Sequence, residues 1–224
     1  LGGGVPVGCA SDRVGSSASQ VVRLSVGEFA TLLEACHHLP IVSIDLSEME
    51  LSPGHVDHLV FFIKACTSLR RLVLSSNSLS SLEVRKIGDV ISCHPNLRTV
   101  DLSACHLCDD GLTTLLESLS PETCQLTHLN LSINCLTSVC SQGLAAFVLE
   151  NTTLTHLDLH GNFIRRSFIE DTIIPALSRN LAAHQSKPKQ RPGSALEFLS
   201  SVDPAAAPYP SLELLSKQVE SADS

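Results

Sequence analysis

Apolar residues recur along this chain in a fixed pattern with a period of 28 or 29 residues. Five segments carry an apolar residue at positions 1, 4, 6 and 11, and most carry Asn or Cys at position 9. A unit of this length holds a short strand and then a helix, because a parallel crossover needs a dozen or more residues to return. The pattern therefore predicts five stacked repeats that share a parallel sheet. They begin at Ile41, Leu69, Leu97, Leu126 and Leu154.

Alternation within each strand predicts which side chains are buried. Positions 4 and 6 are expected to point into the core, and positions 3, 5 and 7 to face solvent. The amide at position 9 is expected to bond to backbone groups that the end of a strand leaves unpaired. Asn77, Asn134 and Asn162 can do this, whereas Cys105 can do so only weakly and Met49 cannot.

The five segments resemble the leucine-rich repeat family, in its ribonuclease-inhibitor-like class with long helical repeats. They read IVSIDLSEMEL, LRRLVLSSNSL, LRTVDLSACHL, LTHLNLSINCL and LTHLDLHGNFI. The resemblance covers residues 41 to about 181. It implies an α/β solenoid, or horseshoe, with a concave parallel β-sheet and convex α-helices. The family shares a binding architecture and no common chemistry, so no reaction is implied.

Helix starts can be located from their own signals. Ser80 with Glu83, and Ser167 with Glu170, have the spacing of capping boxes, and Pro53 after Ser52 is typical of a first helical turn. Apolar runs at helical spacing follow and are expected to cover the convex side. The runs are Val56, Leu59, Val60 and Ile63; Leu82, Ile87, Val90 and Ile91; and Leu112, Leu115, Leu116 and Leu119. A further apolar set, Ile169, Ile173, Ile174 and Leu177, belongs to the helix expected to close the array.

The chain is predicted to have three parts. An extended N-terminal segment covers residues 1–20, the solenoid covers 21–181, and a Pro-rich extended tail covers 182–224. Within the solenoid, residues 21–40 form a partial N-terminal cap and 41–181 the five repeats. A possible strand through Val21, Leu24 and Val26 and a capped helix from Ser25 to His37 are expected in the cap, and a helix from Ser167 to about Leu181 closes the array.

The tail holds five of the eleven prolines of the chain, a composition typical of a linker. Its two short apolar clusters are too small to fold alone. We therefore expect the tail to order itself only against neighbouring proteins. The predicted anchors are Leu196, Phe198, Leu212 and Leu215.

Composition and motifs exclude several classes of function. A net charge of -8, a single Tyr and no Trp argue against direct nucleic-acid binding. No apolar run approaches the length of a membrane span. The chain has no phosphate-binding Gly loop, no metal motif and no Ser/His/Asp set that the repeats would bring together, so no catalysis, cofactor or metal is expected. A basic protein partner suits the acidic chain better.

The nine cysteines are predicted to be free thiols in a reducing compartment, because their number is odd and several fall at buried positions. Cys105 and Cys108 form a CxxC, but Cys105 occupies position 9 and no second ligand pair exists, so a packing role is favoured over a zinc or redox site. Residues 151–153 form a glycosylation sequon that matters only in a secreted chain. Small apolar fillers near the ends of the convex helices are expected at Cys36, Cys66 and Cys93.

Exposed strand positions predict the binding surface, because a solenoid presents rigid, evenly spaced side chains there. Position 5 forms an acidic column, and position 3 carries two histidines on adjacent strands, about 5 Å apart. A metal at this pair would need a third ligand, and His160 lies too far along the strand. Five strands span only about 20 Å, enough for one helix or one peptide. The alternative is that the columns are merely solvated. The predicted contact residues are Asp45, Arg71, Asp101, His128, Asn130, His156 and Asp158.

These features predict a non-catalytic protein–protein interaction scaffold, a structural subunit of a large intracellular assembly with several protein partners. Leucine-rich repeat proteins that resemble this one occur in axonemal and other cytoskeletal assemblies and in mitochondrial complexes, and we favour the cytoplasmic, cytoskeletal setting. The alternative is a regulator of an enzyme, similar to the inhibitors and small-GTPase activators built on this repeat class. A structural subunit should stay with its assembly in salt, whereas a regulator should exchange.

Overall fold

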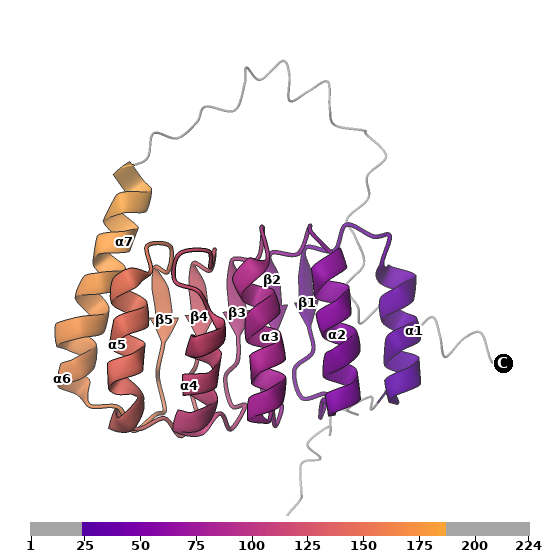
Figure 1. Cartoon of the computed structure of the whole chain (residues 1–224), viewed down its shortest axis with the longest axis horizontal. Coiled ribbons are helices and arrows are strands. Elements are labelled where there is room, and N and C mark those ends of the chain that lie inside the picture. The colour runs from indigo at the N-terminus through magenta and orange to yellow at the C-terminus, as the bar shows by residue number, and fades with distance from the viewer. Residues whose placement is uncertain (1–23, 187–224) are drawn as a thin grey trace, which may run out of the picture.

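The strands form one open parallel sheet in a computed structural model that describes residues 24–186 (Figure 1). The order in the sheet is β1-β2-β3-β4-β5, with every neighbouring pair parallel. Each position of one repeat lies beside the same position of the next, as in Ser43 beside Arg71 and His128 beside His156. The α/β solenoid is confirmed. The strands are β1 (Ser43–Asp45), β2 (Arg71–Val73), β3 (Thr99–Asp101), β4 (His128–Asn130) and β5 (His156–Asp158).

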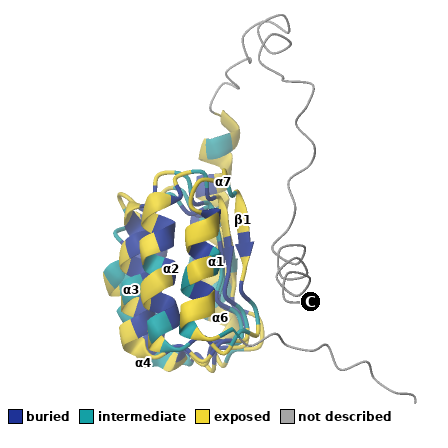
Figure 2. Ribbon diagram, turned by 90° about the vertical axis from the view of Figure 1, so that its right-hand side faces the viewer, coloured by how far each residue is buried: buried dark blue, intermediate teal, exposed yellow. Residues whose placement is uncertain are grey.

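Helices follow the strands and stand together on one side of the sheet (Figures 1 and 2). None of those in the described range is long and apolar enough to cross a membrane. They are α1 (Val26–Cys36), α2 (Pro53–Ala65), α3 (Ser81–Cys93), α4 (Cys108–Ser118), η1 (Ser138–Cys140), α5 (Ser141–Glu150), α6 (Arg166–Phe168), η2 (Ile169–Ile173) and α7 (Ile174–Ser186).

The core lies between the sheet and the helices, as the alternation predicts. Leu72 and Leu74 of the second repeat are fully buried and meet helix residues such as Leu59 in one contiguous cluster. Expectations failed at three positions of the inner repeats. Leu82, at the start of α3, is 63% exposed, whereas Val73 and Ser132, at positions expected to face solvent, are only 5% and 7% exposed. Val73 lies outside the core cluster, between the acidic strand ends on either side.

Asparagines at position 9 form hydrogen bonds that connect successive repeats. Asn134 accepts hydrogen bonds from the backbone N–H groups of Cys105 and Leu107, and its Nδ2 donates to Leu102 O at 2.7 Å. Asn77 and Asn162 make the same kinds of bond between their own repeats. At these three junctions a buried or partly buried amide therefore satisfies turn groups on both sides, which confirms the expected role.

Cys105 reproduces this arrangement only in part. Its Sγ donates to Leu74 O at 3.1 Å, as an asparagine Nδ2 would. The sulfur also takes backbone hydrogen bonds from Asn77 and Ser76, but it is a weaker donor and a weaker acceptor than a side-chain amide. The fully buried Cys105 side chain therefore keeps the packing of the column of position-9 residues, the asparagine ladder, with weaker hydrogen bonds.

Capping boxes begin the first three helices. Ser80 and Glu83 cap α3 as predicted, and Ser25 and Glu28 cap α1. At α2, Ser52 precedes Pro53 as expected, and its box is completed by the His55 ring, whose Nδ1 accepts from Ser52 N at 3.0 Å. A histidine therefore takes the place that Glu or Gln usually holds.

The last helix differs from its prediction. It begins at Arg166 without a side-chain cap, and Glu170 pairs with Arg166 rather than with Ser167. A π-helical turn, Ile169–Ile173, lies just before Pro175. Proline has no N–H and its ring clashes with the carbonyl four residues earlier, which a wider turn relieves. Ile174, one of the apolar residues named for this closing helix, is half exposed.

The ends of the predicted domain scheme fall partly outside the described residues. Residues 1–20, Val21 and the proposed anchors Leu196, Phe198, Leu212 and Leu215 are beyond them. At the N-terminal side, the expected strand finds no counterpart at Leu24, and Val26 already belongs to α1. At the C-terminal side, α7 continues to Ser186, past the predicted end near Leu181.

Candidate functional site

The concave face of the sheet brings the predicted contact residues together. In-register pairing places positions 3 and 5 of all five strands in two columns. Asp45, Arg71, His128, His156 and Asp158 are exposed there, whereas the other two predicted residues are partly buried. The strands lie on the side of the molecule away from α1 to α4 (Figure 2).

The acidic column also has a structural role that the sequence did not reveal. Asp101 Oδ1 accepts from Ser103 N at 2.9 Å and from Ser103 Oγ at 2.6 Å, which closes a turn at the strand end. Asp45 makes the same pair of bonds to Ser47, and Asp158 Oδ1 accepts from His160 N at 2.9 Å. One oxygen of each carboxylate is therefore committed to its own backbone.

Asparagine performs the same turn at this column. Asn130 Oδ1 accepts from Ser132 N at 3.0 Å, and its Nδ2 donates to Asp101 Oδ2 at 3.1 Å. The turn thus needs an acceptor oxygen rather than a charge. The second carboxylate oxygens of Asp45 and Asp158 have no hydrogen-bond partner within residues 24–186, which leaves the charge at both ends of the column available to a ligand.

The two histidines of position 3 are stacked. Their ring centroids lie 4.1 Å apart and their planes differ by 5°, closer than the strand spacing alone predicts. Burial, and then the neighbouring His156, lower the pKa of His128, since both disfavour a charge on that ring. The neutral form of the His128 ring is therefore favoured over its charged form. No group of three or more His, Cys, Asp or Glu in the described part of the chain could hold a metal ion.

An exposed apolar pair at the rim of the face was missed by the sequence reasoning. Ile133 is 57% exposed and Phe163 is 73% exposed, at positions 8 and 10 of the last two repeats. Position 8 is left-handed in every repeat, and Ile133 has φ 56°. A β-branched residue is a clear outlier in that region, where Gly161 fits without strain. Reading columns 8 and 10 across the repeats would have found both residues.

The described cysteines are all free thiols. Cys105 is buried, and burial raises its pKa to about 11, which argues against a reactive CxxC with the exposed Cys108. Burial and the carboxylate of Asp109 raise the pKa of Cys140 to about 12. Cys36 and Cys66 pack as predicted, but Cys93 is exposed, so its role as a filler was wrong.

The glycosylation sequon is occupied by structural contacts. Asn151 is fully buried, its Nδ2 donates to Pro121 O at 3.2 Å, and its Oδ1 accepts from Leu154 N at 2.7 Å. A glycan on that nitrogen would have to displace the junction between two repeats. The folded solenoid is therefore incompatible with glycosylation at this site.

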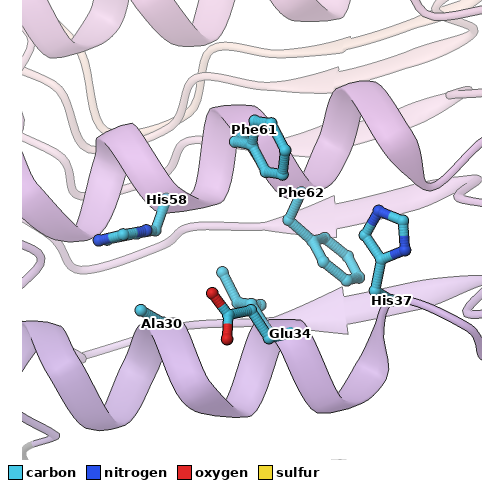
Figure 3. Close-up of a pocket in the computed structure, with 7 residues that line it drawn as sticks. Ala30, Glu34, His37, His58, Phe61 and Phe62 are labelled. Carbon is cyan, nitrogen blue, oxygen red and sulfur yellow. The ribbon is translucent and has the colours of Figure 1, made fainter.

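Two depressions lie on the helical side. The first, between α1 and α2, is lined by residues that include Glu34, His37, His58 and Phe61 (Figure 3). Its volume is about 50 Å³, well below the roughly 300 to 1,000 Å³ of small-molecule sites. The second is an open groove of about 680 Å³ beside α4 and α5. Because it is open, it lacks the enclosure of a metabolite site.

Comparison with known proteins agrees with the repeat geometry. No family model matches the chain. It is 31% identical over 153 residues to mouse Tonsoku-like protein, a match that covers 65% of this chain and 11% of that protein. It is 32% identical over 123 residues to human NACHT, LRR and PYD domains-containing protein 3, covering 54% and 12%. The matches thus span only about an eighth or less of these relatives' length.

Two solved structures share the fold. One is the actin-binding site 2 of leiomodin-1, with a TM-score of 0.61, 14% identity and coverage of 74% of this chain and 95% of that one. The other is the C-terminal domain of Caenorhabditis elegans tropomodulin, with a TM-score of 0.59, 17% identity and coverage of 79% and 99%. Identity this low supports the fold alone. Repeat spacing, an in-register parallel sheet, the asparagine ladder and these likenesses together identify the chain as a leucine-rich repeat protein.

Proposed function

We propose that the chain is a protein-binding module that holds a basic segment of another protein, helical or extended, against its concave sheet. The observation that carries the proposal is the row of exposed, in-register side chains on β1 to β5, on the side away from the helices. On this proposal the chain acts without catalysis, as a structural subunit of a multi-protein assembly.

Charge and turn geometry support a basic ligand. Asp45 and Asp158 each keep one carboxylate oxygen free of hydrogen bonds within residues 24–186, and the two lie at opposite ends of the column. Arg71 is the one basic side chain at positions 3 and 5 of the strands. The exposed Ile133 and Phe163 add an apolar edge to the last two repeats. Amphipathic basic segments match a surface with these two properties.

We further propose an intracellular, cytoskeletal setting. The leiomodin-1 structure that shares the fold is described as an actin-binding site, which makes filamentous actin the first partner to test. Co-sedimentation with actin filaments should pellet the full chain at physiological salt. If the chain stays in the supernatant, filamentous actin is not its partner and other assemblies are tested. Washing the isolated assembly with salt then separates the two roles, because a structural subunit is retained and a regulator exchanges.

A neutralising variant tests the concave face without removing its turns. Asp45, Asp101 and Asp158 are replaced by Asn in the full chain, because Asn130 shows that Asn closes the same turn. The matched control replaces three exposed acids of the helices, as Glu34→Gln, Asp89→Asn and Glu150→Gln. Both variants change the net charge by the same amount.

Crosslinking mass spectrometry on each full-chain variant in cell extract gives the readout. The wild type and the convex control should give crosslinks between the concave repeats and basic segments of a stoichiometric partner, and the concave variant should lose them. A concave variant that keeps its partner, with crosslinks that map to the helices, would contradict the proposal.

A further inference from the structure

The fourth and fifth repeats carry the same unit, Leu-Thr-His-Leu-Asx-Leu, at residues 126–131 and 154–159. In each unit the threonine hydroxyl touches two groups. Thr127 Oγ1 lies 3.1 Å from Arg98 O and 2.9 Å from His128 Nδ1. Thr155 Oγ1 lies 3.1 Å from Thr127 O and 2.9 Å from His156 Nδ1. Both imidazoles are thus held by the same contact, one repeat apart.

One placement of the ring protons allows both contacts of each threonine hydroxyl to be hydrogen bonds. Threonine has one hydroxyl proton, and a carbonyl oxygen can only accept. Both contacts are hydrogen bonds only when the threonine hydroxyl donates to the carbonyl and the ring Nδ1–H donates to the threonine oxygen. Each neutral ring then carries its proton on Nδ1, and its Nε2 is a hydrogen-bond acceptor on an exposed side chain.

We infer that the stacked His128 and His156 form an acceptor pair that binds a basic side chain, lysine or arginine, of the segment held by the concave face. This inference rests on the proposed function and names the chemistry of one subsite within it. The parallel rings place two acceptors side by side, and a cationic N–H donor makes stronger hydrogen bonds to them than a neutral donor would.

The charged groups around the pair favour a cation. Asp158 lies two residues along β5 from His156, about 7 Å away, and Asp101 lies at the same level on β3, one strand over from His128. On β4 the corresponding residue is the neutral Asn130. Arg98 lies before β3, but its Nη1 is bound to the carbonyls of Pro95 and Leu97. His160 follows β5 at position 7 and is exposed.

The same geometry disfavours a metal ion. Ring-nitrogen lone pairs lie in the ring plane, and these two planes are nearly parallel with centroids 4.1 Å apart. A single ion cannot lie in both planes at the roughly 2.0 to 2.1 Å that a histidine ligand requires. The described residues also offer no third ligand.

Nuclear magnetic resonance on the full chain tests the tautomers without any ligand. Long-range ¹H–¹⁵N spectra at neutral pH should show a protonated Nδ1 and an unprotonated Nε2 on both rings. Replacing the two threonines, as Thr127→Val and Thr155→Val, should return the rings to a mixture of tautomers. Protonated Nε2 atoms in the wild type would overturn the inference.

Binding is then measured with three probes: hexa-arginine, hexa-lysine and hexa-glutamate peptides. Hexa-arginine and hexa-lysine should shift both Nε2 resonances, and hexa-glutamate should not. The double variant His128→Gln, His156→Gln should weaken the basic peptides about tenfold, the scale of one charge-assisted hydrogen bond. His58→Gln on α2, also an exposed histidine, is the matched control and should leave affinity unchanged.

Acidification and zinc provide the remaining tests. Protonation converts an acceptor ring into a donor and adds repulsion, so affinity for the basic peptides should fall on acidification, and the double variant should lose this pH dependence. If the three Asp→Asn changes weaken binding of the basic peptides but the histidine double variant does not, the histidine inference is overturned and the concave-face proposal stands. If neither the Asp→Asn changes nor the histidine changes alter the affinity, both proposals are contradicted. Stoichiometric zinc binding at both Nε2 atoms would also overturn the histidine inference.

Discussion

At position 3 the first two repeats carry Ser43 and Arg71, whereas the last two carry His128 and His156. The rim differs in the same way, with Ser76 at position 8 of the second repeat and Ile133 in the fourth. The backbone does not follow this difference, because both pairs of strands are parallel and in register and position 8 is left-handed throughout. The repeated buried residues thus specify the scaffold. The exposed positions can differ between repeats without changing the backbone, and they determine which ligand the surface can bind.

The two ends of the array also differ in how completely they are closed. Position 4 is fully buried in the first four repeats, with Ile44 at 1% and Leu129 at 2% exposed. In the fifth repeat Leu157 is only partly buried. An inner repeat is covered on both sides by its neighbours, whereas in residues 24–186 the outer edge of β5 has no further strand beside it.

The largest expected effect separates an inner repeat from the last one. Leu129→Ala should lower the free energy of unfolding by about 2 to 5 kcal/mol, because it leaves a cavity in a closed core. Leu157→Ala at the equivalent position should cost clearly less, since the wild-type side chain is already partly solvated. Urea unfolding of both variants measures the difference, and equal losses would contradict the idea of an open last repeat.

The asparagine ladder should show the next largest effect. Asn134→Ala removes the partner of two backbone N–H groups and one carbonyl, and should cost about 2 to 3 kcal/mol. Cys105→Ala removes only thiol contacts and should cost about 1 kcal/mol or less beyond its small loss of packing. Thermal unfolding ranks the two. If the cysteine variant is the less stable, the ladder does not hold the repeats as described.

The acidic column should give a smaller effect that depends on the replacement. Asp101→Asn keeps an acceptor oxygen for Ser103 and should change stability by less than about 0.5 kcal/mol. Asp101→Lys opens that turn and should cost about 1 kcal/mol, which makes charge reversal a poor test of binding alone. Urea unfolding compares them, and identical stabilities would mean that the turn bond contributes nothing.

Cysteine labelling tests which thiols are exposed without a change in sequence, so it involves no loss of stability. At about pH 8, iodoacetamide should modify Cys93, Cys108 and Cys135 well before Cys105 and Cys140, because burial and a raised pKa suppress the thiolate of the latter two. Peptide mapping by mass spectrometry gives the order. Thiol counting under denaturing, non-reducing conditions should return all nine, and disulfides in freshly isolated protein would contradict the prediction of a reducing compartment.

The sequence by itself determined the repeat boundaries, the parallel register, the core positions and the asparagine ladder. These features depend on a period repeated five times, so each copy checks the others. It also located the concave columns, including the neighbouring histidines. The capping box at Ser80 was equally readable, because both of its partners lie within one helical turn.

Only the tertiary structure decided what depends on contacts between repeats or on local strain. The stacking of His128 on His156, the turn bonds of the acidic column and the exposure of Ile133 and Phe163 are set by how neighbouring strands and loops meet. Pro175 replaced a predicted regular helix with a π-helical turn, since a steric clash outweighs the apolar spacing. Periodicity records which side chains a fold must bury, but the exposed face carries no such constraint, so its geometry follows from the packing around it.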